Sequence, residues 1–422
     1  MNASAAQSAP TPSHAVVVGA GMVGLSTAWF LQERGVEVTV VDRTGVAAGS
    51  SWGNAGWLPP ALTTPLPEPA VLSYGVKAVL SPSSPVYMPL RADLRLLRFL
   101  AGFARHSTAK QWQRSMGIFA TVNREALAWY DHLLAGGVDA QVRVADPFLV
   151  GLSSAKATSA FVDELHHIEG AGVDVDFEVL AGDVARQDEP ALGAGITGAV
   201  RLTGQRFINP GRFVHALSDS VIARGGKIID GVTVTGVRDL GPAGVVVATS
   251  ADDIRADVVV LATGTWLGGL ARSFGVKAVV QAGRGYSFSV PIETMPAGPV
   301  YFPDVRVACT PLDDRLRVAG MMEFRRPEAA LDPRRIKAII DAARPRLSGV
   351  SWEQRTDEWV GSRPCTADGL PLVGRTRSPR VHVAGGHGMW GIALGPLTGN
   401  YVAEGIVSGN TPDLIKPFDP LR

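Results

Sequence analysis

Cysteine and long apolar runs are what this chain most conspicuously lacks. Its 422 residues contain two cysteines, Cys309 and Cys365, and neither stands in a CxxC pair or near a histidine at ligand spacing. This scarcity argues against a disulfide framework and predicts no metal site. No apolar run reaches the ~18 residues that a membrane-spanning helix needs. The first 13 residues lack the basic start and apolar core of a secretory signal, so we expect a disordered tail and a cytoplasmic protein.

An excess of charge of either sign is also missing. The chain has 40 lysines and arginines against 39 aspartates and glutamates, a formal net charge of +1. With no RNP, zinc-finger or basic-stripe pattern, we expect no nucleic-acid partner. Apolar residues make up 46% and charged residues 19%, which is ordinary for a globular enzyme. The length predicts two domains rather than one core.

The segment from residue 16 to residue 42 has the pattern of a dinucleotide-binding unit. An apolar strand runs into three glycines spaced GxGxxG, a helix is expected to about Arg34, and a second apolar strand ends on a carboxylate. The glycines allow a tight turn, close approach of a pyrophosphate, and close helix packing, and the carboxylate can bind ribose hydroxyls. The alternative is a strand-to-helix turn without a ligand. The predicted cofactor-binding residues here are Gly19, Gly21, Met22, Val23, Gly24, Asp42 and Arg43.

A second GxGxxG match, residues 193–198, lacks this context. It follows Asp188-Glu189-Pro190 instead of a strand and precedes residues 199–202, which are expected to be extended. The sequence therefore predicts a single nucleotide site whose cofactor stays bound.

The order of the elements predicts an α/β fold, with a discontinuous Rossmann-like domain and an inserted α+β domain carrying a mostly antiparallel sheet. After a tail at 1–13, the first domain is expected over 14–60, 190–270 and 356–412, and the substrate domain over 61–189 and 271–355. Prolines crowd residues 57–90 and predict an irregular connection. The helical pattern from Leu90 to about Leu134 has a basic amphipathic face. That face is either solvated or lies peripherally on a membrane.

Four further motifs carry a family resemblance. They are Ser50-Ser51-Trp52-Gly53-Asn54-Ala55-Gly56, Ala262-Thr263-Gly264, Gly361-Ser362-Arg363-Pro364 with Asp368-Gly369, and Gly385-Gly386-His387-Gly388. With the N-terminal unit they resemble the D-amino acid oxidase superfamily of flavoproteins. Within it the chain is most similar to the small-subunit type of bacterial D-amino acid dehydrogenase and, more distantly, to glycine and sarcosine oxidases. The resemblance covers nearly the whole chain. It implies FAD as the cofactor and a substrate with a carboxylate beside an oxidisable C–N bond.

The resemblance also implies further cofactor contacts. The loop at 50–56 would line the pyrophosphate and the flavin ring, and the backbone of Val234 would meet the adenine. The turn at 386–391 precedes a helix whose positive end would favour negative charge on the flavin, with His387 in a structural role. Cys365 does not align with the flavin-linking cysteine of monomeric sarcosine oxidases, so FAD is expected to be non-covalent. The added residues are Ser50, Ser51, Asn54, Ala55, Gly56, Val234, Ala262, Thr263, Gly264, Arg363, Gly386, His387, Gly388, Met389, Trp390 and Gly391.

Arg363 is expected to bind the substrate carboxylate, because a guanidinium fork can donate two parallel hydrogen bonds to it. From the sequence alone an arginine before a proline would be a surface residue, and the resemblance favours the functional interpretation. Relatives place a tyrosine on the strand over the substrate, which residues 305–310 lack. Tyr286 and Tyr301 are candidate substitutes. Trp57, Met322 and Trp390 could complete an apolar pocket, although each alone also fits an ordinary core.

The reaction that the resemblance implies is hydride transfer from the substrate α-carbon to FAD, followed by hydrolysis of the imine. The substrate would be a D-amino acid, glycine or an N-substituted glycine, which makes it an amino-acid or secondary-amine carboxylate. One alternative is a flavin-dependent hydroxylase or halogenase that uses NAD(P)H, but Gly385-Gly386-His387 stands where that class carries Gly-Asp. The other alternative is a non-catalytic FAD-binding subunit of a larger complex.

Overall fold

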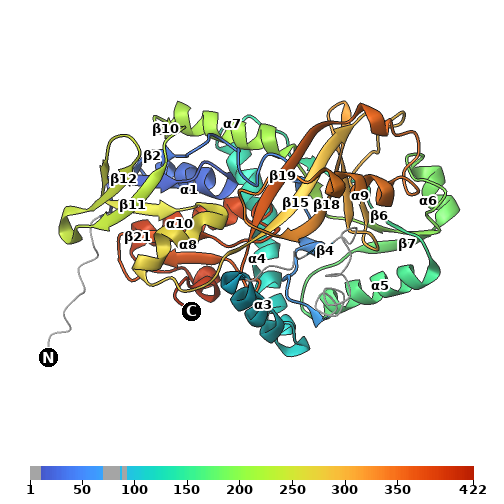
Figure 1. Ribbon diagram of the computed structural model, residues 1–422, viewed down its shortest axis with the longest axis horizontal. Coiled ribbons are helices and arrows are strands. Elements are labelled where there is room, and N and C mark those ends of the chain that lie inside the picture. The colour runs from blue at the N-terminus through green and yellow to red at the C-terminus, as the bar shows by residue number, and fades with distance from the viewer. Residues whose placement is uncertain (1–10, 70–85, 88–92) are drawn as a thin grey trace.

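The computed structural model describes residues 11–69, 86–87 and 93–422. Most of the expected N-terminal tail, much of the proline-rich connection, and the expected helix start at Leu90 lie outside the described residues. Two sheet systems lie side by side along the long axis of the molecule, each with helices packed on it (Figure 1). Within the described chain, every helix is too short or too polar to cross a bilayer.

The first system is built on a six-stranded sheet in the order β10-β2-β1-β14-β21-β20. The first five strands are parallel, and β20 pairs antiparallel to β21 at the edge. Strands β1, β2 and β14 are almost wholly apolar and buried, as a sheet covered on both faces requires. The strands are β1 (His14–Val18), β2 (Glu37–Val41), β10 (Lys227–Ile229), β14 (Val258–Leu261), β20 (Leu372–Arg375) and β21 (Val381–Gly385).

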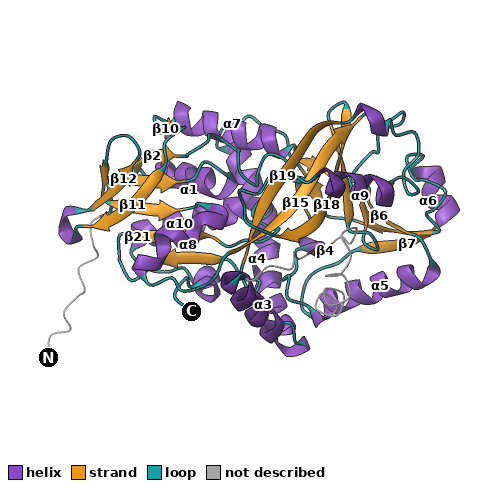
Figure 2. Cartoon of the chain, viewed as in Figure 1, coloured by secondary structure: helices purple, strands orange, loops and turns teal. Residues whose placement is uncertain are grey.

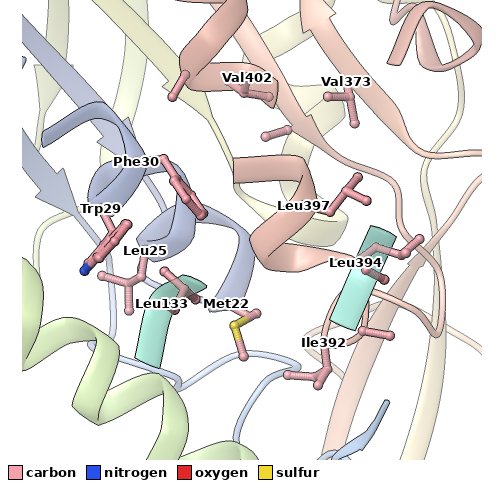
Figure 3. Packing of buried hydrophobic residues seen from close by; sticks show 14 of the residues in the cluster. Met22, Leu25, Trp29, Phe30, Leu133, Val373, Ile392, Leu394, Leu397 and Val402 are labelled. Atoms are coloured by element: carbon pink, nitrogen blue, oxygen red, sulfur yellow. The ribbon is translucent and has the colours of Figure 1, made fainter. Parts of the chain in front are cut away.

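Four helices cover this sheet around one hydrophobic cluster, shown in part in Figure 3. They are α1 (Met22–Glu33), α4 (Ala109–Ala135), α7 (Pro210–Ala223) and α10 (Gly395–Ser408). Two glycines let α10 approach α1 closely. A Cβ on Gly395 would lie 2.4 Å from Met22 Cγ, and a Cβ on Gly399 would lie 2.6 Å from the Ser26 carbonyl carbon. This close contact holds the glycine-rich start of α1 against the C-terminal segment.

A small antiparallel sheet and several short helices complete the first system. The strands are β11 (Val234–Asp239), β12 (Val245–Thr249) and β13 (Ile254–Ala256). The short helices are α8 (Leu267–Ala271), with 3-10 turns at Gly264–Trp266, Arg272–Phe274, Gly241–Ala243 and, near the C-terminus, Asp413–Phe418.

The second system is a mostly antiparallel sheet to which nine described strands belong, in the order β19-β15-β18-β17-β16-β6-β8-β7 with β4 beside β18 (Figure 2). Its long strands β15 and β18 lie on the side of this sheet that is next to the first system (Figure 1). The strands are β4 (Val86–Tyr87), β6 (Phe148–Leu152), β7 (Phe177–Ala181), β8 (Gly198–Leu202), β15 (Gln281–Val290), β16 (Val300–Phe302), β17 (Val307–Leu312), β18 (Arg315–Phe324) and β19 (Thr356–Cys365).

Helices α3 (Leu94–His106), α5 (Ala155–Gly170), α6 (Gly182–Asp188) and α9 (Pro333–Ala343) surround this sheet, with a 3-10 turn at Trp352–Gln354. A third small sheet joins β3 (Trp57–Leu58), β9 (Arg206–Phe207) and β5 (Arg143–Val144). The 3-10 turn Pro60–Leu62 follows β3 inside the proline-rich stretch.

The predicted α/β fold with an antiparallel second sheet is the fold observed. Local details differ from expectation. The apolar pattern over 142–152 predicts one strand, but the structure has two, since Pro147 cannot donate a ladder hydrogen bond. The helical stretch to Leu134 is two helices, because Thr108 caps a new one by accepting from the Gln111 N–H. The helix expected after the turn at 386–391 begins at Gly395.

Two strands lie in a sheet other than the one their expected domain segment implies. Strand β8 falls within 190–270 and β19 begins the segment 356–412, yet both pair in the second sheet. An apolar strand pattern does not state which sheet the strand joins, so these boundaries could not be placed from the sequence.

Candidate active site

A cavity of about 1100 Å³ lies between the two sheet systems. Its walls combine the carboxyl ends of β1, β2 and β14 with the loop at 50–56, the turn at 387–392, and strands β15, β18 and β19. Ligands in parallel α/β sheets bind outside the carboxyl ends of the strands. The cavity therefore extends from the expected cofactor turn to the second sheet.

The GxGxxG turn at one end of the cavity has the close contacts that only glycine allows. Gly19 has φ +115°, and a Cβ on it would lie 2.5 Å from the Ala262 carbonyl oxygen. A Cβ on Gly24 would lie 2.0 Å from the Gly19 carbonyl oxygen. Gly21 faces Ser51, whose hydroxyl oxygen accepts from the Met22 N–H at 3.2 Å. The turn and the loop at 50–56 are thus joined beside the start of α1.

Asp42 lies at the end of β2 and lines the cavity. Its carboxylate accepts from three backbone N–H groups, those of Ala20 at 2.9 Å, Thr44 at 2.8 Å and Gly45 at 3.0 Å. These bonds hold the carboxylate at the cavity edge, where its contact with a ribose stays a prediction.

Arg43, the next residue, stacks on the indole of Trp266, and both residues line the cavity. Its guanidinium lies 3.7 Å from the ring centroid of Trp266. The Trp266 Nε1 donates to Glu328 at 2.6 Å, and this hydrogen bond lowers the pKa of Glu328. The hydrogen bond from Trp266 to Glu328 links the first sheet system to the segment that follows β18.

The loop at 50–56 is tied to the second sheet at several points. Ser50 donates to the Ser362 carbonyl, Ser287 donates to the Gly53 carbonyl at 2.8 Å, and Thr310 donates to the Ala55 carbonyl at 2.8 Å. Asn54 accepts from the Gly56 N–H at 2.8 Å. The loop therefore has a fixed shape, as a surface for a flat ring requires.

The end of β14 supplies a buried hydroxyl that the protein leaves without a partner. Ala262, Thr263 and Gly264 line the cavity, as does Val234 on the neighbouring sheet. Among the described residues, nothing hydrogen-bonds the buried Thr263 Oγ1. An unpaired buried hydroxyl is costly, so this atom is suited to a bound group.

The turn at 387–391 closes another side of the cavity. The Trp390 Nε1 donates to the Thr64 carbonyl at 2.7 Å, and the Gly388 N–H donates to the Pro364 carbonyl at 3.0 Å. His387 Nε2 lies 2.9 Å from Thr398 Oγ1, and burial lowers the pKa of His387 to about 4. A neutral, bonded imidazole fits the structural role expected of it.

Arg363 on β19 lines the cavity beside the second sheet. Its Nη1 donates to the Met321 carbonyl oxygen at 2.8 Å and lies 3.8 Å from the Met322 sulfur. No carboxylate among the described residues forms an ion pair with it. Burial lowers the pKa of Arg363 from its usual value, yet an arginine stays protonated in proteins. The cavity wall thus holds a charged guanidinium that has no counter-ion within the described part of the chain.

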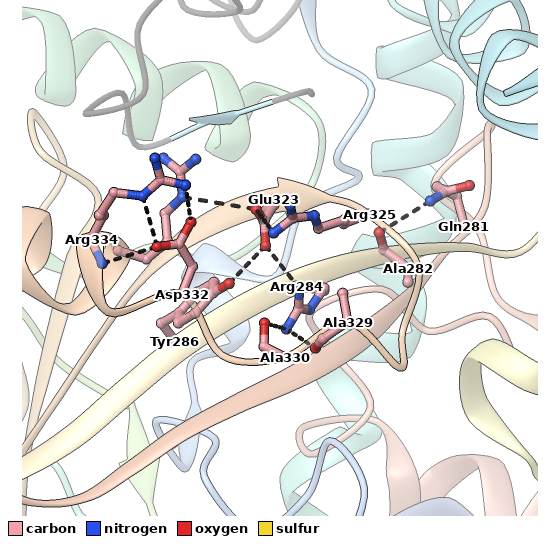
Figure 4. A network of polar contacts seen from close by, with 11 residues as sticks. Gln281, Ala282, Arg284, Tyr286, Glu323, Arg325, Ala329, Ala330, Asp332 and Arg334 are labelled. Carbon is pink, nitrogen blue, oxygen red and sulfur yellow. Dashed lines mark hydrogen bonds and ion pairs between the residues drawn. The ribbon is translucent and has the colours of Figure 1, made fainter. Parts of the chain in front are cut away.

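Tyr286 differs from the expectation that its hydroxyl reaches the substrate. It borders the cavity, but its hydroxyl donates to Glu323 Oε2 at 2.7 Å, and Arg284 Nη1 donates to the same oxygen at 3.1 Å (Figure 4). Residues 284 and 286 share one face of β15, and Gly285 on the other face lies under Arg363. The hydroxyl is therefore bound in a buried charge cluster on the face away from Arg363.

Tyr301 and Trp57 line a different end of the cavity. Their rings pack edge to face with centroids 5.4 Å apart, and the Trp57 Nε1 donates to Thr310 at 2.8 Å. Burial is the main cause that raises the pKa of Tyr301 to about 12. The nearby charge of Arg306 acts in the opposite direction and only partly offsets the effect of burial. Glu164 also lines this end; burial and the neighbouring Glu68 raise the pKa of Glu164 to about 7.

Most of the expected site residues come together in this one cavity. Gly56 and Gly386 are not among its described lining residues; they shape the turns, with φ of +75° and +72°. Sequence reasoning missed several lining residues, because an isolated apolar or acidic residue carries no local signal of function. The missed residues are Leu66, Glu68, Phe99, Leu100, Phe103, Glu164, Trp266, Phe324 and Trp359.

The described residues fit an FAD molecule. The turn at Gly19 and Gly24 has no space for side chains, Thr263 offers an unpaired buried hydroxyl, and the loop at 50–56 is fixed beside them. Neither Cys309 nor Cys365 is among the described residues that line the cavity, and burial raises the pKa of both thiols. This arrangement agrees with the expectation of non-covalent binding, which stays a prediction.

Comparison of the sequence with known proteins also indicates an FAD-dependent enzyme. The DAO family, described as FAD dependent oxidoreductase, matches residues 14–405. The D-amino acid dehydrogenase of Cereibacter sphaeroides is 30% identical over 411 residues, which cover 94% of this chain and 92% of that protein.

Solved structures share the fold. Glycine oxidase from Geobacillus kaustophilus superposes with a TM-score of 0.73 at 19% identity, over 98% of this chain and 99% of that one. Glycine oxidase from Bacillus cereus gives a TM-score of 0.69 at 21% identity, over 93% and 94% of the two chains. These matches confirm the family resemblance, the fold and the FAD cofactor that the sequence motifs implied. The chain belongs to the DAO family of FAD-dependent oxidoreductases.

Proposed function

We propose that this enzyme oxidises the C–N bond of an amino acid, namely a D-amino acid, glycine or an N-substituted glycine. The single observation that carries this proposal is Arg363, a guanidinium in the cavity wall that has no ion-pair partner among the described residues. A partly buried charge needs compensation, and a substrate carboxylate would provide it. The names of the curated relative and of the two glycine oxidases support an amino-acid substrate.

In this proposal, one set of residues binds the substrate and another set binds FAD. Because Nη1 of Arg363 is engaged by the Met321 carbonyl, its remaining N–H groups are the ones that would bind the substrate carboxylate. The residues of the Gly19–Gly24 turn, Asp42, Thr263 and the loop at 50–56 would hold FAD, which supplies the two-electron acceptor when bound. The substrate α-carbon would lose a hydride as the neutral amine becomes an iminium, which would release a proton to water to give the imine, and water would then hydrolyse the imine to a carbonyl compound and an amine or ammonia.

This chemistry requires no strong base from the protein if the amine enters neutral. His387 lines the cavity but is held by Thr398, and its pKa of about 4 leaves it neutral at physiological pH. The hydroxyl of Tyr286 is bound by Glu323. The proposal therefore assigns the protein the roles of orientation and electrostatic complement.

The test is anaerobic bleaching of the bound flavin by a panel of D-amino acids, glycine, sarcosine and N-alkyl glycines. Bleaching by at least one of them, followed by detection of the carbonyl product, is the expected result. A flavin that no member of the panel bleaches, but that NADPH does, would exclude amine oxidation and favour the hydroxylase class. Turnover by the purified chain alone would also exclude the non-catalytic subunit.

A further inference from the structure

An apolar wall begins directly beside Arg363. The sulfur of Met322 lies 3.8 Å from Arg363 Nη1, and both residues line the cavity. Phe324 follows on the same strand and packs against Phe99 of helix α3, with ring centroids 5.5 Å apart. Phe99 in turn packs against Phe103 at 5.9 Å. All four apolar residues line the cavity and form one hydrophobic cluster, so the wall is continuous from the guanidinium to the helix.

Helix α3 is held against the start of β15, the strand that pairs with β19, and β19 carries Arg363. Asp93 caps it by accepting from the N–H groups of Arg95 at 2.9 Å and Leu96 at 3.2 Å. The Arg95 Nη2 donates to the carbonyl of Val280, just before β15, at 2.7 Å. Because of these bonds the phenylalanine face of α3 has a defined position over the cavity.

Helix α3 has one face that lines the cavity and another that is exposed to solvent. Phe99, Leu100 and Phe103 line the cavity, whereas Leu94 and Leu97 are 85% and 55% exposed on the other side. Helix α3, which belongs to the stretch with the basic amphipathic face, thus covers the cavity with its apolar face.

The charged residues that line the cavity near the second sheet form a different set. Arg306 lowers the pKa values of Glu68, Glu164 and Tyr301, and Glu68 raises that of Glu164. The hydrophobic cluster next to Arg363 contains none of them; besides the four residues above, its described members that line the cavity are Leu66, Val86, Leu100 and Met389.

We propose that the amino acid oxidised here carries a bulky apolar side chain, aliphatic or aromatic, which packs against Met322, Phe324 and the phenylalanines of α3. This inference rests on the proposed function, in which Arg363 holds the carboxylate. A ligand bound at Arg363 has the apolar wall next to it. Each methylene that reaches the wall is therefore transferred from water to an apolar surface. Such burial is worth ~0.8 kcal/mol per methylene, about fourfold in affinity.

The test uses straight-chain carboxylates that lack an amine and so cannot be oxidised by this chemistry. Binding of acetate, butanoate, hexanoate and octanoate to the FAD-loaded enzyme is followed by the change in flavin absorbance and by calorimetry. The expected result is a Kd that falls about fourfold for each added methylene until the wall is covered. The Phe103→Ala variant should flatten this dependence, whereas Leu97→Ala on the exposed face of the same helix should leave it unchanged.

A second arm separates an apolar subsite from a cationic one. We expect 6-aminohexanoate, which ends in an ammonium, to bind at least about tenfold more weakly than hexanoate, because an ammonium loses solvation against an apolar wall. Equal or tighter binding of 6-aminohexanoate would overturn the inference and point to the acidic residues instead.

The outcomes distinguish this inference from the proposed function. If all four carboxylates bind with equal affinity and Arg363→Met abolishes that binding, the apolar subsite is wrong while the carboxylate anchor stands. If none of them binds, and no amino acid bleaches the flavin, both are wrong. The chain-length series on the unaltered enzyme decides the question even if Phe103→Ala does not fold.

Discussion

Arg363 Nη1 donates a hydrogen bond to the carbonyl oxygen of Met321 at 2.8 Å. Met321 has φ +67° within strand β18, where the register with β15 shifts between the pairs of Arg284 and Tyr286. A non-glycine residue at positive φ inside a strand is held there by its surroundings at some cost. The bulge turns this carbonyl out of the ladder, and it fixes the guanidinium at the cavity wall.

Replacing Arg363 with methionine should weaken substrate binding. Loss of a charge-assisted hydrogen-bonded partner costs roughly 1.5–3 kcal/mol, so KM should rise about 10- to 100-fold while the FAD content stays the same. Steady-state kinetics and the flavin-to-protein absorbance ratio check this. Arg272→Met, at an exposed guanidinium, is the control. An unchanged KM in Arg363→Met would remove the assignment.

Gly285→Ala should disturb the same contact without removing a functional group. A Cβ at Gly285 would lie 2.3 Å from Arg363 Nη2, the far end of a flexible side chain, so the fold can adapt while the guanidinium moves. We expect a higher KM, on the order of tenfold, from a misplaced charged hydrogen bond. Gly268→Ala is the matched control, because no atom lies within 4 Å of its added Cβ. Identical KM values in the two variants would argue against a positional role for Gly285.

Thr263→Val tests the unpaired hydroxyl at the end of β14. If FAD provides its partner, the variant should bind FAD more weakly by roughly 0.5–1.5 kcal/mol, about 2- to 10-fold in Kd. The cofactor-free protein should lose no stability, since the hydroxyl has no partner among the described residues. Titration of the apoprotein with FAD gives the Kd, and thermal melts with and without FAD give the stabilities. Equal FAD affinity would show that the hydroxyl faces no cofactor atom.

Stability should fall on mild acidification because two histidines are buried as neutral groups. Burial lowers the pKa of His382 and His387 to about 4 each, whereas an unfolded imidazole titrates near 6.5. Between these values the unfolded state binds protons that the native state does not, so the stabilisation is fully present above about pH 6.5 and is lost as the pH falls towards about 4. The loss is on the order of 3 kcal/mol per histidine at ~1.4 kcal/mol per unit of pKa.

Denaturant unfolding of the wild type and of His387→Gln at several pH values across that window measures this loss. The glutamine can keep a polar contact with Thr398 but does not titrate, so the variant should lose less stability than the wild type by the contribution of one histidine. The raised pKa of Glu164, at about 7, acts in the opposite direction over this window, but it is shared by both proteins and cancels in their difference. The lowered pKa of Asp332, at about 2, acts in a more acidic range. Parallel stability curves for the two proteins would contradict the assignment.

The cofactor end of the site was predictable from the sequence because its geometry is local. The turn from Gly19 to Gly24 and the carboxylate of Asp42 lie within one strand-helix-strand unit. The start of α7 is also set locally, because Asn209 caps this helix and Pro210 is its first residue. In each case the residues that dictate the conformation are neighbours in the chain.

The substrate end was predictable only in part, because its residues meet across long sequence distances. Arg363 depends on a bulge at Met321, and Tyr286 differs from expectation because the alternation of β15 presents its hydroxyl to Glu323. Phe99 and Phe103 have the spacing of ordinary core residues, and only the packing of α3 against β18 places them at the cavity. No local pattern could distinguish these roles.

The most direct test of the account compares the best amino-acid substrate of the bleaching screen with the amine that lacks its carboxylate. The two molecules carry the same C–N bond, and they differ in the group that Arg363 would bind. Flavin reduction is followed anaerobically with each, in the wild type and in Arg363→Met. We predict fast bleaching of the wild type by the amino acid, and bleaching by the amine that is at least about tenfold slower and insensitive to Arg363→Met. Equal bleaching of the wild type by both compounds would contradict the claim that this cavity oxidises amino acids held by Arg363.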